Sequence, residues 1–192
     1  FVVSAYLQVV RGYNAIETGV IFTAATLGLL ASSLAAERLA KRRAQRTLIL
    51  AGFVLTIAGI GLLLFLVSGS PTAWAFAPGL LLIGLGLGTM LTPSVNIVQS
   101  SFPESQQGEI SGLSRSVSNL GSSLGTAVAG TILVAGITAT PGRAYALAMT
   151  ALAVVGVIGL VAAVRLPTKL QSATAHDAAQ QGGPSDRITR RG

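Results

Sequence analysis

The sequence contains no cysteine and a single histidine, His176, which lies in the polar last segment. The absence of cysteine excludes a disulfide framework and a thiolate metal site. One histidine cannot supply the ligand cluster of a metal centre. We therefore expect no metal site, no cofactor and no redox chemistry.

Charged residues are also scarce: they make up 10% of the chain, whereas hydrophobic residues make up 51%. This balance is far from that of a soluble domain. The apolar residues come in blocks close to the ~20 residues that a helix needs to cross the hydrocarbon of a membrane. An exported soluble protein with apolar core helices is the alternative, but several spans this long with so few charges argue against it. We predict an all-α integral membrane protein with about five full transmembrane helices and one helix truncated at the N-terminus. The expected spans are residues 1–10, 16–36, 47–67, 74–98, 110–137 and 145–164.

The chain divides into a transmembrane bundle, residues 1–166, and a polar segment, residues 167–192. The second segment is rich in Ala, Gln, Ser, Gly and basic residues without apolar periodicity, which predicts a disordered tail. The first apolar run begins at Phe1 without a basic leader or a cleavage site, so it is not typical of a secretory signal. We expect the chain to be a fragment of a longer protein.

The basic residues indicate the orientation in the membrane. They gather in residues 37–46 and in residues 165–192, whereas residues 67–73 contain none. Positively charged loops face the cytoplasm, and an even number of expected spans separates the two basic segments. We therefore expect a multi-pass protein of the cell membrane with both segments cytoplasmic. The net charge of +7 is a topology signal, and we do not expect nucleic-acid binding.

Polar residues are unevenly distributed among the expected spans. Residues 47–67 and 145–164 are nearly free of them, which is typical of peripheral helices that face lipid. The other spans carry hydroxyls, amides and one arginine, which membranes tolerate where helices touch or polar cargo passes. The candidate substrate-pathway residues are Tyr6, Gln8, Thr89, Asn96, Arg115, Ser118, Asn119 and Ser122.

Small residues and one proline mark helix contacts. The run Gly84 to Gly88 could be mistaken for a dinucleotide-binding loop, but no strand precedes it and it lies within a span. We predict that Gly84, Gly88, Gly112, Gly121 and Gly125 let helices approach closely. Pro93 removes a backbone hydrogen bond inside its span and predicts a kink. The kink is either a hinge or an ordinary helix end.

Arg115 is a cation within an expected span, where an unpaired charge costs several kcal/mol. It lies about 10 Å by helical rise from Gly108, so its side chain could snorkel to the inner interface. The alternatives are a gate contact or a contact with an anionic substrate.

Several motifs together resemble the major facilitator superfamily, and within it the fourteen-spanning drug:proton antiporters of the EmrB/QacA type. The matching features are Tyr6-Leu7-Gln8, Gly12-Tyr13, the glycine run from Gly84 to Gly88 with Pro93, Pro103, and Gly108 to Gly130 with Arg115. The basic loop, through Leu39, Arg42 and Arg46, resembles a repeat of a signature of the family. The resemblance covers residues 1–164.

The resemblance implies that residues 1–10, 16–36, 74–98 and 110–137 line the cavity of the carboxyl-terminal bundle. It also implies alternating access, with proton entry driving the export of a lipophilic or cationic small molecule. The partners implied are the small-molecule substrate, protons, the lipid bilayer and the missing N-terminal half of the same transporter. Coupling carboxylates and the antiporter glycine motif would lie in that half.

Other functions stay open at this point. The same fold could export a lipid, a siderophore or a sugar, or the chain could be a non-transporting membrane subunit. A membrane-embedded enzyme would need intramembrane nucleophiles or paired carboxylates, and the spans offer only scattered serines without a His or Asp partner. We therefore expect a transporter and no enzyme.

Overall fold

The computed structural model of this chain describes residues 1–40, 44–67, 72–136 and 138–165. The described part is helical, and five of its helices are long and apolar enough to cross a membrane, which confirms the predicted fold class. The elements are α1 (Val2–Ala5), η1 (Tyr6–Val10), α2 (Ala15–Ala40), α3 (Gln45–Val67), η2 (Ala73–Phe76), α4 (Ala77–Ser100), η3 (Glu104–Gln106), α5 (Gln107–Gly136) and α6 (Pro141–Val164). η1 is a π-helix that continues α1, and η2 and η3 are 3-10 turns that lead into α4 and α5.

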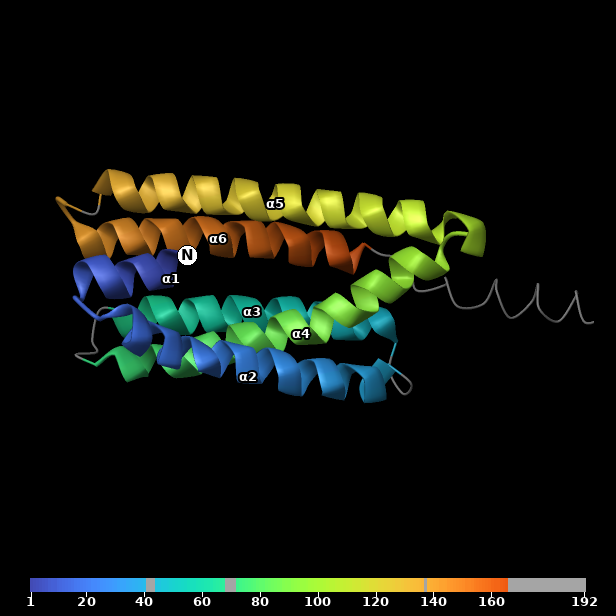
Figure 1. Ribbon diagram of the computed structural model, residues 1–192, viewed down its shortest axis with the longest axis horizontal. Helices are drawn as coiled ribbons and strands as arrows, with labels where there is room; N and C mark the ends of the chain where they lie inside the picture. The colour runs from blue at the N-terminus through green and yellow to red at the C-terminus, as the bar shows by residue number, and fades with distance from the viewer. Residues whose placement is uncertain (41–43, 68–71, 137, 166–192) are drawn as a thin grey trace, which may run out of the picture.

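The helices form two layers (Figure 1). One layer holds α2, α3 and α4, and the other holds α1, α5 and α6. The layers meet where α3 packs on α6. There Gly156 and Gly159 leave room for the side chains of Ile57 and Phe53, because a Cβ at either glycine would come within 3.3 Å or less of those side chains.

Glycines allow α4 to pack very closely between α2 and α3. A Cβ on Gly84 would lie 2.0 Å from the carbonyl oxygen of Ala25, and one on Gly88 would lie 2.1 Å from Oγ of Ser32. On the other side of α4, a Cβ on Gly86 would lie 2.6 Å from the carbonyl oxygen of Gly52. No larger side chain fits these three positions unless the helices separate.

One end of the bundle, which we call the Val10 end, is closed by an aromatic cluster. It consists of Tyr6, Phe76 and Tyr145, which are all buried. The ring centroids of Tyr6 and Tyr145 lie 4.5 Å apart, and Phe76 meets Tyr145 edge-on at 6.4 Å. Such contacts contribute beyond the buried area, so they hold η1 and η2 against α6.

The opposite end, which we call the Ser100 end, brings the two basic segments together. Arg46, at the start of α3, donates a hydrogen bond from Nη2 to the carbonyl oxygen of Val164, at the end of α6. Arg38 and Arg165 lie at the ends of α2 and α6 on this side. Arg42 and residues 166–192 lie outside the described residues.

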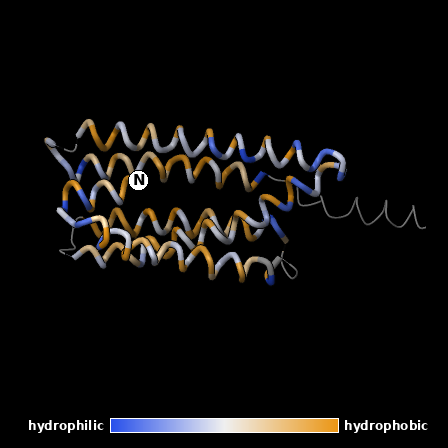
Figure 2. Tube along the Cα trace, viewed as in Figure 1, coloured by the Kyte–Doolittle hydropathy of each residue, from blue (hydrophilic) through white to orange (hydrophobic). Residues whose placement is uncertain are grey.

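Large apolar side chains cover much of the outer surface. Phe65 of α3 is 78% exposed, Leu124 of α5 is 66% exposed and Val155 of α6 is 65% exposed. Figure 2 shows α6 hydrophobic over most of its length, and the first half of α5 paler and bluer. Such a surface is suited to contact with the hydrocarbon of a bilayer. The first half of α5 is the polar exception.

Candidate functional site

The first half of α5 carries a polar face on the side of the helix that, farther along, packs into the bundle. Helical spacing places Ser111, Arg115, Ser118 and Ser122 on one side of α5. Farther along the same face, Ala129 and Leu133 are buried against the rest of the bundle. The face of α5 that joins the core near the Val10 end is therefore polar and uncovered by the described helices near the Ser100 end.

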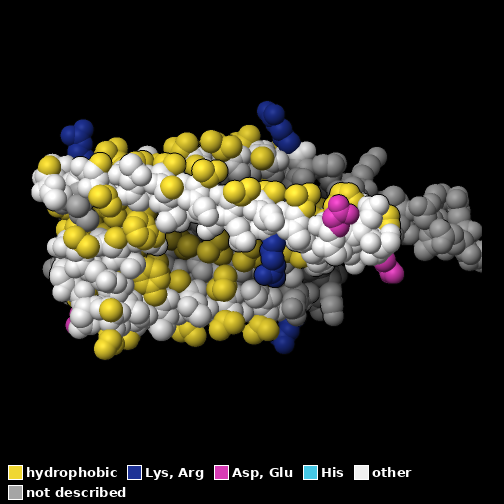
Figure 3. All heavy atoms as spheres, turned by 45° about the horizontal axis from the view of Figure 1, so that its top comes forward, with side chains coloured by type: hydrophobic (Ala, Val, Ile, Leu, Met, Phe, Trp, Pro, Cys, Tyr) yellow, Lys and Arg dark blue, Asp and Glu magenta, His cyan; other side chains and the backbone are white. Residues whose placement is uncertain are grey.

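A cleft of about 300 Å3 opens between this face and the last turns of α4. Its lining consists of Val95, Val98, Gln99, Ser111, Ser114, Arg115 and Ser118. Gln99 closes one side by donating a hydrogen bond from Nε2 to Oγ of Ser111 over 3.2 Å. Figure 3 shows the hollow beneath α5, floored by hydrophobic side chains, with a basic side chain on its rim.

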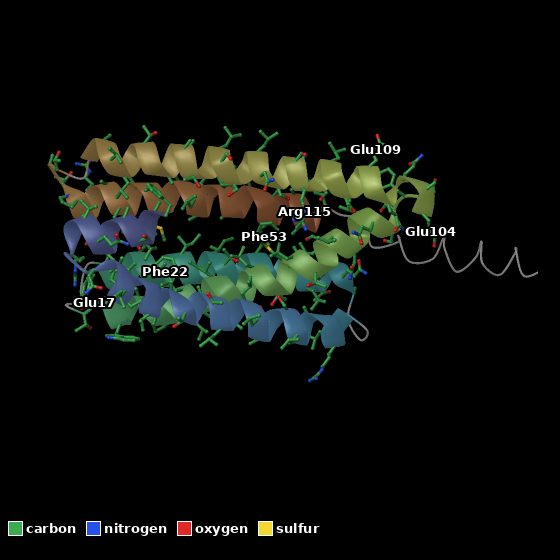
Figure 4. All side chains as sticks on the ribbon, in the orientation of Figure 1. Glu17, Phe22, Phe53, Glu104, Glu109 and Arg115 are labelled. Carbon is green, nitrogen blue, oxygen red and sulfur yellow. The ribbon has the colours of Figure 1, made fainter. Side chains whose placement is uncertain are left out.

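Arg115 is the charged group of the cleft. Its side chain points from α5 toward the layer of α3 and α4 (Figure 4). Within the described ranges it forms no ion pair and donates no hydrogen bond. Glu104 and Glu109 belong to η3 and to the first turn of α5, and their side chains lie nearer the Ser100 end (Figure 4). Arg115 thus gives the cleft a positive charge that no carboxylate among the described side chains pairs with.

The predicted pathway residues of α4 lie around its proline. Thr89 is half-buried, and its hydroxyl donates to the carbonyl oxygen of Leu85 over 2.7 Å. Pro93 is buried and lies inside a helix that continues across it. Asn96 is exposed one turn later. Figure 1 shows that the second half of α4 leaves α2 and α3 and runs toward the start of α5, so the part of α4 that contains Pro93 leads into the wall of the cleft.

The two candidates on the π-helix differ in environment. Tyr6 is buried in the aromatic cluster, where it contacts Phe76 and Tyr145. Gln8 is exposed, and its Nε2 donates to Oγ of Ser4 over 3.3 Å. In the conformation described, Tyr6 is thus part of the seal at the Val10 end. A π-helix is a strained element that occurs often at functional sites.

The remaining candidates of α5 lie beyond the cleft, toward the middle of the helix. Asn119 and Ser122 are exposed. Gly121 and Gly125 line a second, apolar groove of about 320 Å3 with Ala151, Leu152 and Val155 of α6. A Cβ at Gly112, Gly121 or Gly125 would meet no atom within 4 Å. The packing role predicted for these three glycines stays a prediction, and it concerns surfaces that the described helices leave open.

Some lining residues were absent from our predicted site. Ser111 and Ser114 had a signal, since they lie on the polar face of the expected span 110–137, whereas Gln99 lies one residue beyond the expected span 74–98, where a polar residue is ordinary. Val95 and Val98 had no signal, because an apolar residue at a helix surface is equally suited to lipid. No group of three or more His, Asp or Glu side chains that could hold a metal occurs among the described residues.

The chain is similar in sequence to one protein family and to several known proteins. The sequence profile described as Major Facilitator Superfamily matches residues 1–189. The chain is 33% identical over 130 residues to the puromycin resistance protein pur8 of Streptomyces alboniger, an alignment that covers 66% of this chain and 26% of that protein. It is 30% identical over 135 residues to the multidrug efflux pump LfrA of Mycolicibacterium smegmatis, covering 70% of this chain and 27% of the pump. The multidrug resistance protein Stp of Mycobacterium tuberculosis is 31% identical over 135 residues, with 70% of this chain and 25% of Stp covered. The matched stretch thus spans about a quarter of each of these relatives.

Proposed function

Because this chain belongs to the major facilitator superfamily, we propose that it supplies the carboxyl-terminal helical bundle of a membrane exporter for lipophilic or cationic small molecules. The observation that carries the proposal is the cleft between α4 and α5, where a polar helix face opens inside an otherwise apolar bundle. The two resistance proteins and the efflux pump among its relatives support an export function.

Alternating access requires a second bundle that rocks against this one. The exposed polar face of α5 supports this, because serines, an asparagine and an arginine on a spanning helix need protein or water beside them. We place the second bundle against this face, with Asn119, Ser122, Gly121 and Gly125 near the contact. Pro93 is the hinge about which the second half of α4 moves.

Proton coupling is the second part of the proposal. The carboxylates of the described side chains are Glu17, in the first turn of α2, and Glu104 and Glu109, near the start of α5. All three lie at helix ends, where water solvates them, so they are poor carriers of protons through the membrane. We therefore assign the proton carrier to the facing bundle, with the cleft of this chain contributing to the substrate pathway.

We assign the Ser100 end to the cytoplasm and the chain to the plasma membrane. The hydrogen bond between Arg46 and Val164 supports the first assignment, since it joins the two basic segments at one end. The cleft then opens to the cytoplasmic side and the aromatic cluster closes the outer side. Tyr6 would reach the pathway when that cluster opens.

An efflux assay with paired substitutions tests the proposal. Ser118→Phe places a large side chain inside the cleft, whereas Thr150→Phe changes an exposed hydroxyl residue of peripheral helix α6. In cells that express the intact reading frame carrying this chain, we expect Ser118→Phe to raise ethidium retention and Thr150→Phe to leave it unchanged. Membrane levels of both variants must match the wild type.

The outcomes separate export from its energy source. Equal ethidium retention in both variants and in the wild type would contradict the pathway role of the cleft. Export that survives a protonophore but is lost in Ser118→Phe would leave the cleft in place and contradict proton coupling.

A further inference from the structure

Arg115 is an exposed cation in the cleft between α4 and α5. The guanidinium lies on a membrane-spanning helix, and no described residue pairs with it. An uncompensated cation in a low-dielectric surrounding is costly, so such groups pair with an anion or reach water. The cleft around Arg115 shows which kind of anion fits.

The polar part of the cleft lining is a set of hydrogen-bond donors around one cation. Ser111, Ser114 and Ser118 contribute three hydroxyls beside the guanidinium of Arg115. Gln99 lies across from them on α4. A guanidinium binds phosphate oxygens in a bidentate manner, and hydroxyls donate to the oxygens that remain. This donor set suits a phosphate group.

The position of Arg115 along the membrane normal suits the phosphate of a lipid headgroup. The 30 residues of α5 span about 45 Å, against about 30 Å for the hydrocarbon of a bilayer. With α5 centred, about 7 Å projects beyond the hydrocarbon at each end. Arg115 lies about 12 Å from the start of α5, which leaves its Cα a few ångströms inside the hydrocarbon border. A snorkelling guanidinium from there reaches the headgroup layer.

The rest of the lining fits a lipid better than a free ion. Val95 and Val98 form an apolar wall beside the polar groups, against which an acyl chain can lie. The charged groups around the opening belong to several elements. Glu104 and Glu109 lie toward the start of α5, and Arg46 lies at the Ser100 end of α3. Glu109 precedes Arg115 by six residues, which turns it about 120° away around the helix, so it does not face the cleft.

We propose that the cleft between α4 and α5 binds the phosphate of a lipid from the leaflet at the Ser100 end, with Arg115 as the principal anion-binding group. Ser111, Ser114 and Ser118 donate to the remaining phosphate oxygens, and Val95 and Val98 contact the proximal part of the acyl chain. This inference rests on the proposed function, because the lipid shares its cleft with the proposed substrate pathway and would compete there with an exported molecule.

Native mass spectrometry of the full 192-residue chain in a phosphate-free maltoside detergent tests this proposal. The probes are dioleoyl phosphatidylglycerol, dioleoylglycerol, which lacks the phosphate, and inorganic phosphate as a competitor. We expect one tightly bound phosphatidylglycerol per chain and only weak, unsaturable adducts of dioleoylglycerol. Inorganic phosphate should compete poorly, because it cannot use the apolar wall.

Substitutions locate the site. Arg115→Gln should raise the dissociation constant for phosphatidylglycerol about tenfold or more, since it removes the charged donor. Arg115→Lys should have a smaller effect, because an ammonium keeps the charge but loses the bidentate geometry. Arg143→Gln is the matched control, because Arg143 is an exposed arginine at the other end of the bundle. Circular dichroism checks that each variant is folded, and Ser114→Ala with Ser118→Ala replaces Arg115→Gln if the latter does not fold.

Three results would overturn the proposal. Unchanged binding in Arg115→Gln, or in its replacement, would place the lipid elsewhere. Equal binding of dioleoylglycerol would show that the phosphate is not recognised. Displacement of the lipid by inorganic phosphate at similar concentrations would show a free-anion site instead of a lipid site.

Discussion

The packing glycines of α4 and α5 share a sequence pattern but have opposite surroundings, and this contrast yields our main prediction. We consider Gly84→Ala on α4 and Gly121→Ala on α5. A Cβ on Gly84 would lie 2.0 Å from the carbonyl oxygen of Ala25, whereas a Cβ on Gly121 meets nothing within 4 Å. The same methyl group therefore enters a tight seam in one variant and open space in the other.

The expected magnitudes follow from this geometry. Ordinary contact begins at 3.4 Å, so in Gly84→Ala the helices α2 and α4 must move apart by 1.4 Å, the difference between 3.4 Å and 2.0 Å. Overpacking of this kind costs about 1–3 kcal/mol. Replacing glycine by alanine inside a helix stabilises the folded state by roughly 0.5–1 kcal/mol. We expect Gly84→Ala to lower the free energy of unfolding by about 1–2 kcal/mol and Gly121→Ala to raise it by about 0.5–1 kcal/mol.

The assay is equilibrium unfolding of the chain in mixed micelles, titrated with sodium dodecyl sulfate and followed by the circular dichroism of the helices. The two variants should differ by about 2 kcal/mol, which corresponds to about 30-fold in the unfolding constant. Gly125→Ala is a second control, since its Cβ is also unobstructed. A stable Gly84→Ala, or a Gly121→Ala that is the less stable of the two, would refute the reasoning.

Two further predictions concern the Val10 end. Tyr145→Phe should be neutral or raise the free energy of unfolding by about 1 kcal/mol in the same titration, because the Tyr145 hydroxyl is buried without a hydrogen-bond partner among the described residues; a loss of that size would mean that the hydroxyl is bonded. Gly12→Ala should cost about 1 kcal/mol, because Gly12 has a φ of 72° and alanine resists the left-handed region. A Cβ would meet nothing within 4 Å at Gly12 or at Gly142, so Gly142→Ala is a control that adds the same methyl group without the left-handed backbone. Equal unfolding curves for Gly12→Ala and Gly142→Ala would contradict the prediction.

Much of the architecture could be predicted from the sequence. The expected span 47–67 compares with Gln45–Val67 for α3, and the expected span 110–137 compares with Gln107–Gly136 for α5. Such spans can be predicted from the sequence because hydrocarbon permits only helices whose backbone groups are satisfied internally and whose length matches the bilayer. The ends of the helices are harder to predict. α2 continues to Ala40 and α6 begins at Pro141, since polar helix ends project into the interface where hydropathy gives no boundary.

The candidate site was predictable only in part. The polar face of α5 follows from helical spacing, so Arg115 and Ser118 could be chosen without a structure. Tyr6 could not be placed in this way, because tyrosine suits both a cavity wall and a buried aromatic cluster. Val95 and Val98 were equally ambiguous, since an apolar side chain faces lipid or a cleft with the same composition.

The sequence by itself determined that this protein is a helical membrane bundle, which of its helices are apolar throughout, and which face of α5 is polar. Only the tertiary structure decided which glycines lie in a seam and which lie open, that Tyr6 belongs to a closed aromatic cluster, and that the polar face of α5 meets the last turns of α4 in a cleft. The physical reason is that partition into a bilayer depends on each segment alone, through its own length and polarity. Packing depends on which surfaces meet, and helices far apart in the sequence supply those surfaces.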